Sequence, residues 1–283
     1  MKKTTIIMIA TAIGGFILTL SVIAITTSYG IRADMSPIVI SNESTESVAI
    51  TMADNIEVTQ PEDRYLGISL SAGIEIIVAD TTGSPRVEYP SGLAPYITVS
   101  ERNGKLNLLI NRPDSSAGRG YYRHIECSHP IRIITPASPA KIRSTLSQVP
   151  VDLKDAVTDS IHMQIKGTTN FRNCRLGLVT VNPDDLGQYP YMDDLGQYPY
   201  IKIQNTSIST IALGERTLRL SINADSLSTV EAIDWHSTLD ADASCSLETG
   251  SLRIARISFS SVNDSTDFAL HTSGAFTLNT ISK

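Results

Sequence analysis

The short motifs that identify common enzyme classes are missing from this chain of 283 residues. It has no Gly-x-Ser-x-Gly elbow, which presents the nucleophile of many serine hydrolases. It has no P-loop and no dinucleotide fingerprint, the glycine-rich turns that hold phosphate groups. The sequence therefore predicts no catalytic residue, no metal ligand set and no cofactor.

Cysteine and positive charge are both scarce. The three cysteines, Cys127, Cys174 and Cys245, are an odd number, so at least one is unpaired in a monomer. Two could form a disulfide in an oxidising compartment, but we favour small buried residues. The single tryptophan, Trp235, is expected in the core. With 29 acidic and 23 basic residues, the chain has a net charge of −6, which argues against a nucleic-acid partner.

An uncharged run from Thr4 to Tyr29 follows Met1, Lys2 and Lys3. A helix needs about 20 apolar residues to cross the hydrocarbon core of a membrane. We predict a transmembrane helix over residues 5–27, after a cytoplasmic tail at residues 1–4, because lysines are retained on the cytoplasmic side. The alternative is a cleaved signal peptide. In both interpretations the bulk of the chain is periplasmic or extracellular.

The rest of the chain has the pattern of an all-β protein. Beyond a linker at residues 28–45, short alternating apolar segments separated by Gly, Pro, Asn and Asp predict an N-terminal β region over residues 46–135. The clearest element is a hairpin from Tyr96 to Ile110, since Asn103 and Gly104 suit the two positive φ angles of a type I′ turn.

After residue 136 similar strands recur at a spacing near twenty residues. Ser207–Ile211 resembles Ser226–Val230 nineteen positions later, and Ser246–Thr249 follows at twenty. Such a period predicts a β-helix over residues 136–283, in which stacked turns bury one continuous apolar column. The alternative is an ordinary β-sandwich whose strands have this spacing by chance.

A nine-residue segment is duplicated at residues 184–201. Asp184–Met192 is followed directly by Asp193–Ile201, and eight of the nine positions are identical. Nine residues are half of the expected period, so the duplication predicts a surface loop, either simply tolerated there or used for contact. In the second case aromatic rings could stack on sugars or peptides and aspartates could hold a cation. The candidate binding residues are Tyr189, Tyr191, Tyr198, Tyr200, Asp184, Asp185, Asp193 and Asp194.

Several segments together resemble a known family. They are Leu66-Gly-Ile-Ser-Leu, Pro85-Arg-Val-Glu-Tyr, the hairpin from Tyr96, Ile131-Arg-Ile-Ile-Thr-Pro and the later Leu-x-Leu strands. This pattern is similar to the auto-transporter adhesin head domain family, called GIN, from the envelopes of Bacteroidetes-like bacteria. The resemblance implies a strand-rich region that leads into a right-handed parallel β-helix, and a binding function at the cell envelope. It implies no catalytic residues.

Two clusters could hide other chemistry. His124, Cys127 and His129 include residue types that bind zinc, but a fourth ligand is missing and we interpret them as ordinary loop residues. Asp240 and Asp242 would share one face of a strand and could act as paired carboxylates on a glycosidic bond. Such pairs also arise by chance on polar faces.

The sequence thus predicts a non-enzymatic, membrane-anchored envelope protein. Its partners would be the membrane, through the N-terminal helix, and a glycan or an envelope protein, or a second copy of the chain. The alternative function is a membrane-tethered enzyme that acts on polysaccharides and uses a β-helix scaffold.

Overall fold

The computed structural model divides the chain into two compact units, Met1–Ser36 and Pro37–Lys283, which we describe separately. The residues that the structure describes are 13–21, 38–41, 44–60, 66–79, 84–110, 123–146, 149–165, 167–182, 200–214, 217, 219–238, 244–250, 252–262 and 266–272.

The described part of the first unit is a helix at residues 13–21. Apolar side chains such as Phe16 and Leu18 are exposed on it. Among the described residues, no helix is long and apolar enough to cross a membrane. The transmembrane helix predicted over residues 5–27 is therefore not supported, because the described helix would extend only about 14 Å against a hydrocarbon core of about 30 Å.

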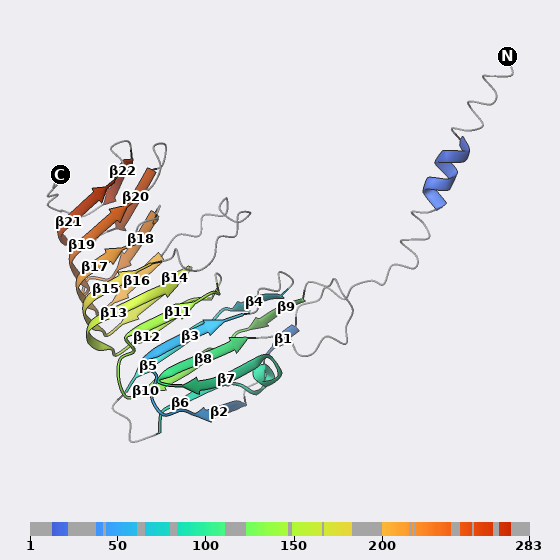
Figure 1. The fold of residues 1–283 in the computed structure, drawn as a ribbon, viewed down its shortest axis with the longest axis horizontal. Helices are drawn as coiled ribbons and strands as arrows, with labels where there is room; N and C mark the ends of the chain where they lie inside the picture. The colour runs from blue at the N-terminus through green and yellow to red at the C-terminus, as the bar shows by residue number, and fades with distance from the viewer. Residues whose placement is uncertain are drawn as a thin grey trace, which may run out of the picture. The chain divides into compact units, whose positions relative to one another are not determined.

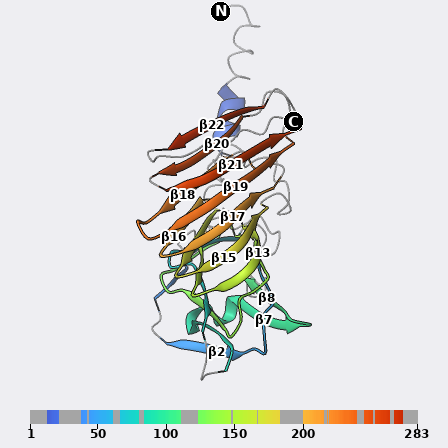
Figure 2. The same cartoon turned by 90° about the vertical axis from the view of Figure 1, so that its left-hand side faces the viewer.

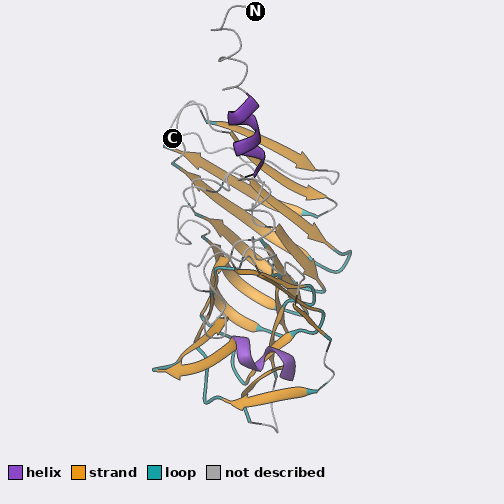
Figure 3. Ribbon diagram, turned by 90° about the vertical axis from the view of Figure 1, so that its right-hand side faces the viewer, coloured by secondary structure: helices purple, strands orange, loops and turns teal. Residues whose placement is uncertain are grey.

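The second unit consists almost entirely of strands, most of which belong to two long open sheets (Figures 1 and 3). The ten-stranded sheet has the order β2 (Thr45–Ala49), β6 (Arg86–Pro90), β10 (Ile131–Thr135), β5 (Ile74–Val78), β12 (Val151–Lys154), β14 (Thr168–Arg172), β16 (Tyr200–Gln204), β18 (Arg219–Ala224), β20 (Ser244–Gly250), β22 (Asp267–Thr272). The nine-stranded sheet has the order β21 (Ile254–Ser261), β19 (Thr229–Ser237), β17 (Ser207–Leu213), β15 (Arg175–Val181), β13 (Val157–Ile165), β11 (Lys141–Ser144), β3 (Asn55–Thr59), β8 (Lys105–Ile110), β7 (Ile97–Arg102).

Two smaller elements complete the second unit. A three-stranded parallel sheet has the order β1 (Ile38–Ile40), β9 (Arg123–Cys127), β4 (Leu66–Leu70). A short 3₁₀-helix, η1 (Ser91–Tyr96), connects β6 with β7. The described residues of the second unit are therefore rich in strands, as the alternating pattern predicts.

The core lies between the two long sheets because each strand alternates apolar and polar side chains. In β5, Ile74 and Ile76 are fully buried, and in β8 the same holds for Leu106 and Leu108. From β11 onward successive strands enter the two sheets in turn, and each pairs in parallel with the next strand of its own sheet (Figure 2). The buried side chains of both sheets form one continuous cluster.

The predicted strand-rich region leading into a right-handed parallel β-helix is wrong as a description of this fold. The strands form open sheets, and each long sheet contains strands from both sides of residue 135. The expected period also fails. Val157 pairs with Arg175, eighteen residues on, but Arg175 pairs with Ser207, thirty-two residues on.

The predicted period was wrong because strands of both sheets have the same alternation of apolar and polar side chains. Ser207–Ile211 lies in β17 of the nine-stranded sheet, whereas Ser246–Thr249 lies in β20 of the ten-stranded sheet. A match between them therefore compares two different sheets.

The predicted hairpin is confirmed. β7 and β8 pair antiparallel, and Arg102 lies opposite Lys105 across the turn. Asn103 has φ +53° and Gly104 has φ +73°, as the two central residues of a type I′ turn require. This local signal was readable because the turn type depends on two adjacent residues.

A single left-handed residue turns the chain from the ten-stranded sheet into the nine-stranded sheet at three successive corners. These residues are Asp155, Asn173 and Asn205, with φ of +60°, +55° and +47°. Asn and Asp tolerate this conformation better than other residues with a Cβ. Stacking joins their side chains: Asn173 Nδ2 donates to Asp155 Oδ1 at 3.2 Å, and Asn205 Nδ2 donates to Asn173 Oδ1 at 2.9 Å.

The residue after each of these corners points inward and is buried. These residues are Ala156, Cys174 and Thr206. The Cys174 amide donates to Thr206 Oγ1 at 3.1 Å, and the Cys174 thiol donates to the Leu153 carbonyl at 3.4 Å. The corner therefore satisfies its own buried backbone groups.

The three cysteines are free and buried, which confirms the interpretation as small core residues. Burial raises the pKa of each thiol above its ordinary value. The expectation for Trp235 is also confirmed. It is buried and contacts Phe259 and Phe268 edge-on, with ring centroids 6.0 and 5.6 Å away.

The corners make a prediction about stability. We expect Asn205→Ala to lower the free energy of unfolding by about 1–2 kcal/mol, because alanine pays the full cost of a positive φ and cannot bond to Asn173. Asn205→Gly should cost less, since glycine adopts this φ freely. Urea unfolding of both variants measures the difference. Equal losses of stability in the alanine and glycine variants would show that the positive φ at residue 205 does not cause the difference. Gln204→Ala, at the neighbouring exposed position, is the control.

Candidate binding surface

Of the eight predicted binding residues, one lies within the described part of the chain. Tyr200 is the first residue of β16, and its half-buried ring lies on the outer face of the ten-stranded sheet. The Lys202 amine is 5.6 Å from the ring centroid, and Asn223 Nδ2 lies 3.3 Å from the hydroxyl. Tyr189, Tyr191, Tyr198, Asp184, Asp185, Asp193 and Asp194 lie outside the described residues.

The structure therefore places the end of the duplicated segment in a strand. Tyr200 pairs with Thr168 and Ser221, and the following Ile201 is buried. The prediction of a contact loop stays a prediction for the other seven residues. For Tyr200, too, binding stays a prediction, and its described contacts are those with Lys202 and Asn223.

The other two clusters considered from the sequence lie partly or wholly outside the described residues. The Cys127 thiol donates to the His129 carbonyl at 3.5 Å, and the His124 side chain lies outside the description. Within the described residues there is no group of three or more side chains that could hold a metal ion. His236 Nδ1 lies 2.8 Å from Ser260 Oγ, whereas Asp240 and Asp242 fall outside the described ranges.

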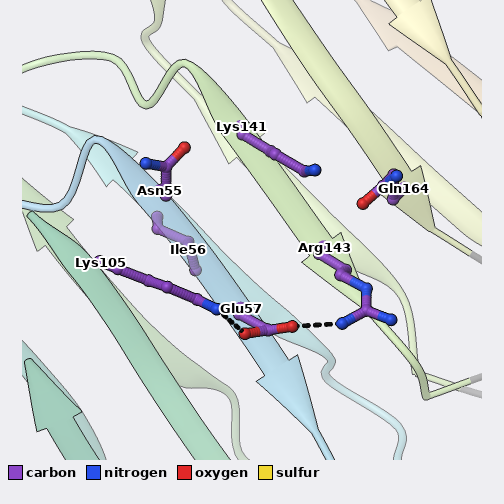
Figure 4. Close-up of a pocket in the computed structure, with 7 residues that line it drawn as sticks. All are labelled: Asn55, Ile56, Glu57, Lys105, Lys141, Arg143 and Gln164. Carbon is purple, nitrogen blue, oxygen red and sulfur yellow. Dashed lines mark hydrogen bonds and ion pairs between the residues drawn. The ribbon is translucent and has the colours of Figure 1, made fainter. Parts of the chain in front are cut away.

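A groove of about 450 Å³ lies on the outer face of the nine-stranded sheet. It crosses β8, β3, β11 and β13, which are neighbours in that order (Figure 4). Its lining residues, which we call the basic groove, are Asn55, Ile56, Glu57, Lys105, Lys141, Arg143 and Gln164. None of them was singled out from the sequence.

Glu57 forms the centre of the basic groove. It accepts ion pairs from Lys105 on one neighbouring strand and from Arg143 on the other, as Figure 4 shows. Burial by itself raises the pKa of this carboxyl, but the hydrogen bonds and charges of Lys105 and Arg143 outweigh burial. The pKa of Glu57 is therefore below its ordinary value of 4.5. The carboxylate is charged at neutral pH and holds both cations in place.

The register explains why these residues meet. Asn55 lies opposite both Lys105 and Lys141, and Arg143 lies opposite both Glu57 and Gln164. The groove thus consists of two outward rows that run across the strands. Gln164, only 3% exposed, supplies a buried amide at one end.

The row of outward positions through Lys141 contains no further Lys or Arg from β13 to β19. It continues across these strands as His162, Thr180, Ala212 and Asp234. The cations of the groove come from β8 and β11.

A second carboxylate has the same arrangement on the ten-stranded sheet. Glu75 in β5 is paired with Arg132 at 3.0 Å and with Lys154 at 2.6 Å. Its pKa is also lowered, because these two partners outweigh the effect of burial. Here Asp152 lies directly opposite Glu75 and adds a second negative charge.

The sequence carried a weak signal for the basic groove. Asn55-x-Glu57, Lys105-x-Asn107 and Lys141-x-Arg143 are the polar members of alternating strands, and so point outward. Nothing local says that β3, β8 and β11 are neighbours. Their parallel pairing over 50 to 90 residues of chain is a tertiary property.

No protein-family model matches this chain, and no curated protein matches it. The predicted membership of the GIN family is therefore not shown by a family match and stays a prediction.

A comparison with solved structures found several matches. One is described as a "putative adhesin" from Bacteroides fragilis, with 16% identity, a TM-score of 0.46, and coverage of 86% of this chain and 100% of that one. Another, a "putative lipid binding protein" from Parabacteroides distasonis, has 12% identity, a TM-score of 0.45, and coverage of 87% and 100%. A third, a "putative adhesin" from Parabacteroides merdae, has 9% identity, a TM-score of 0.36, and coverage of 86% and 97%.

The strand spacing makes a prediction about the duplication. Deleting Asp184–Met192 shortens the 32-residue step from Arg175 to Ser207 to 23 residues, the same step that separates the paired residues Ser244 and Asp267. We expect the free energy of unfolding to change by less than about 0.5 kcal/mol, because loop length has a small effect on closure entropy. Urea unfolding measures this. A large loss would mean that both copies pack into the fold.

The lowered pKa of Glu57 makes a prediction about pH. Its ion pairs stabilise the protein at pH values above 4.5, and this contribution is lost as the pH falls through the lowered folded-state pKa. Glu57→Gln should therefore lower the free energy of unfolding by about 1 kcal/mol at neutral pH. The difference from the wild type should shrink as the pH falls below 4.5 through the lowered pKa of Glu57. Urea unfolding at neutral pH and in a series of acidic buffers tests this, and a difference that does not shrink in acid would contradict it.

Proposed function

We propose that the chain is a non-enzymatic cell-envelope protein that binds a glycan, or another envelope component, at the basic groove. The observation that carries this proposal is the groove itself. Seven residues from four neighbouring strands line it, and the side chains of the six polar ones carry hydrogen-bonding groups. A surface of this kind suits a ligand rich in hydroxyl or charged groups.

Rigid strands support the binding role. Each lining residue belongs to a strand paired on both sides, and Glu57 already orients Lys105 and Arg143. Side chains that are ordered before binding lose less entropy when a ligand arrives. The groove therefore needs no rearrangement of its backbone to accept a partner.

Charged side chains also converge in enzymes that act on polysaccharides, but the chemistry here favours binding. Glycoside hydrolysis uses two carboxylic groups, one of which must stay protonated as a general acid. The basic groove has one carboxylate, Glu57, whose pKa is lowered rather than raised. It is ionised and occupied by two cations, so it offers neither a proton nor a free nucleophile.

The location at the cell envelope is part of the proposal. The uncharged run from Thr4 to Tyr29, after two lysines, supports export of the chain. An exported binding surface would face polysaccharides and proteins of the envelope. Protease treatment of intact cells tests this part, since a cytoplasmic chain would be protected.

The experiment is a screen of the full-length protein against envelope polysaccharides for both binding and cleavage. The groove variant Asn55→Ala/Gln164→Ala should weaken binding, because it removes two amides without changing charge. Lys202→Ala, on the outer face of the other sheet, is the control and should bind normally. Shortening of the polysaccharide would refute the non-enzymatic proposal. Binding that neither variant affects would refute the assignment of the site to the basic groove.

A further inference from the structure

The basic groove carries more positive charge than its own carboxylate can balance. Three cationic side chains, Lys105, Lys141 and Arg143, surround the single carboxylate of Glu57. Lys105 and Arg143 are both paired with Glu57. The Lys141 amine, by contrast, makes no ion pair or hydrogen bond with another described residue. The lining residues of the groove therefore carry three positive charges against one negative charge, in a chain whose net charge is −6.

The spacing of these cations favours a ligand with several anionic groups. Lys141 and Arg143 lie two residues apart on the same face of β11, about 6.5 Å along the strand. Lys105 lies two strands away from Lys141, about 9.6 Å across the sheet. A single small anion can contact one of these positions, whereas a chain with repeated anionic groups can reach all three.

The remaining groups suit a sugar rather than a bare anion. Asn55 lies between Lys105 and Lys141 in the same row, and Gln164 lies opposite Arg143. Amide groups donate to and accept from hydroxyl groups. Cationic positions that alternate with amide positions thus match a polymer whose units carry both an acidic group and hydroxyls.

We propose that the basic groove binds an acidic polysaccharide, whose carboxylate or sulfate groups are held by Lys141, Arg143 and Lys105. This inference rests on the proposed function and specifies its ligand class. Lys141 is the primary contact because its amine is paired with no described residue. Glu57 has two opposing effects: it orients Lys105 and Arg143, and it offsets part of their charge.

The ten-stranded sheet provides a natural comparison. The triad of Arg132, Glu75 and Lys154 has the same chemistry as Arg143, Glu57 and Lys105. Asp152 lies beside Glu75 and is itself paired with Arg172 at 3.2 Å. Three cations there face two carboxylates, which leaves a surplus of one charge. We therefore expect this second triad not to bind the polymer.

The role of Glu57 gives a test in which two variants change affinity in opposite directions. Lys141→Gln should weaken binding of the full-length protein to a polyuronate by about three- to tenfold, since it removes the unpaired charge. Glu57→Gln should strengthen binding by a similar factor, because the surplus rises from two charges to three. Lys154→Gln, a matched loss of one cation on the other sheet, should leave the affinity unchanged. Thermal unfolding checks that each variant is folded.

The ligand arms separate the possible outcomes. A polyuronate and a sulfated polysaccharide should both bind, with affinity falling as salt rises. If the polyuronate alone or the sulfated polymer alone binds, that arm identifies the anionic group and supports the inference. A neutral glucan of similar length should bind at least tenfold more weakly. Lys141→Arg should restore binding, because it keeps the charge.

Other results would overturn the inference. If the neutral glucan binds as tightly as the acidic polymers, the proposed glycan-binding function stands but the acidic ligand class is wrong. If no polysaccharide binds at all, the proposed function fails as well. If duplex DNA binds as tightly as the polyuronate, the groove recognises charge alone and the assignment to a polysaccharide is refuted. Weaker binding by Glu57→Gln would equally contradict the charge argument.

Discussion

The left-handed corner between the two long sheets is the constraint on which the rest of this structure depends. At Asp155, Asn173 and Asn205 one residue turns the chain from a strand of the ten-stranded sheet into a strand of the nine-stranded sheet. Since side chains alternate along a strand, a shift of one residue at a corner would exchange the buried and exposed faces of everything that follows. The side-chain bonds from Asn205 to Asn173 and from Asn173 to Asp155 link these corners and oppose such a shift.

The basic groove follows from the parallel register of β8, β3, β11 and β13. Parallel pairing places Asn55 between Lys105 and Lys141, and it places Arg143 between Glu57 and Gln164. Each strand contributes only one or two groups, so the site belongs to the sheet and not to any single segment. This arrangement also explains why Glu57 is charged: its two cationic neighbours come from strands that are distant in sequence.

Two similar ion-pair triads have different charged neighbours, and these neighbours determine the local charge of each outer face. Around Glu57 the additional neighbour is Lys141, and around Glu75 it is Asp152. Exposed ion pairs contribute little to stability on their own, about 0–1 kcal/mol. Their larger effect here is on the local charge of each outer face. A mildly acidic protein can thus present one basic binding surface.

Local chemistry was readable from the sequence, and long-range pairing was not. The hairpin at Asn103 and Gly104 was predicted correctly because a type I′ turn depends on two adjacent residues. The burial of Trp235 and of the cysteines followed from residue type alone. The repeat was misread, because Ser207–Ile211 and Ser246–Thr249 have the same alternation but lie in different sheets. The transmembrane helix was inferred from an apolar run, and the described helix covers only residues 13–21 of it.

The sequence by itself determined that the second unit is built from strands, because alternation of apolar and polar residues is a local property with a period of two. It also determined which side chains of each strand point outward, including Glu57, Lys105, Lys141 and Arg143. Only the tertiary structure decided that these four lie together. Parallel strands pair through backbone hydrogen bonds, which are the same whichever side chains are present. The partners of β3 are therefore set by the packing of the whole core.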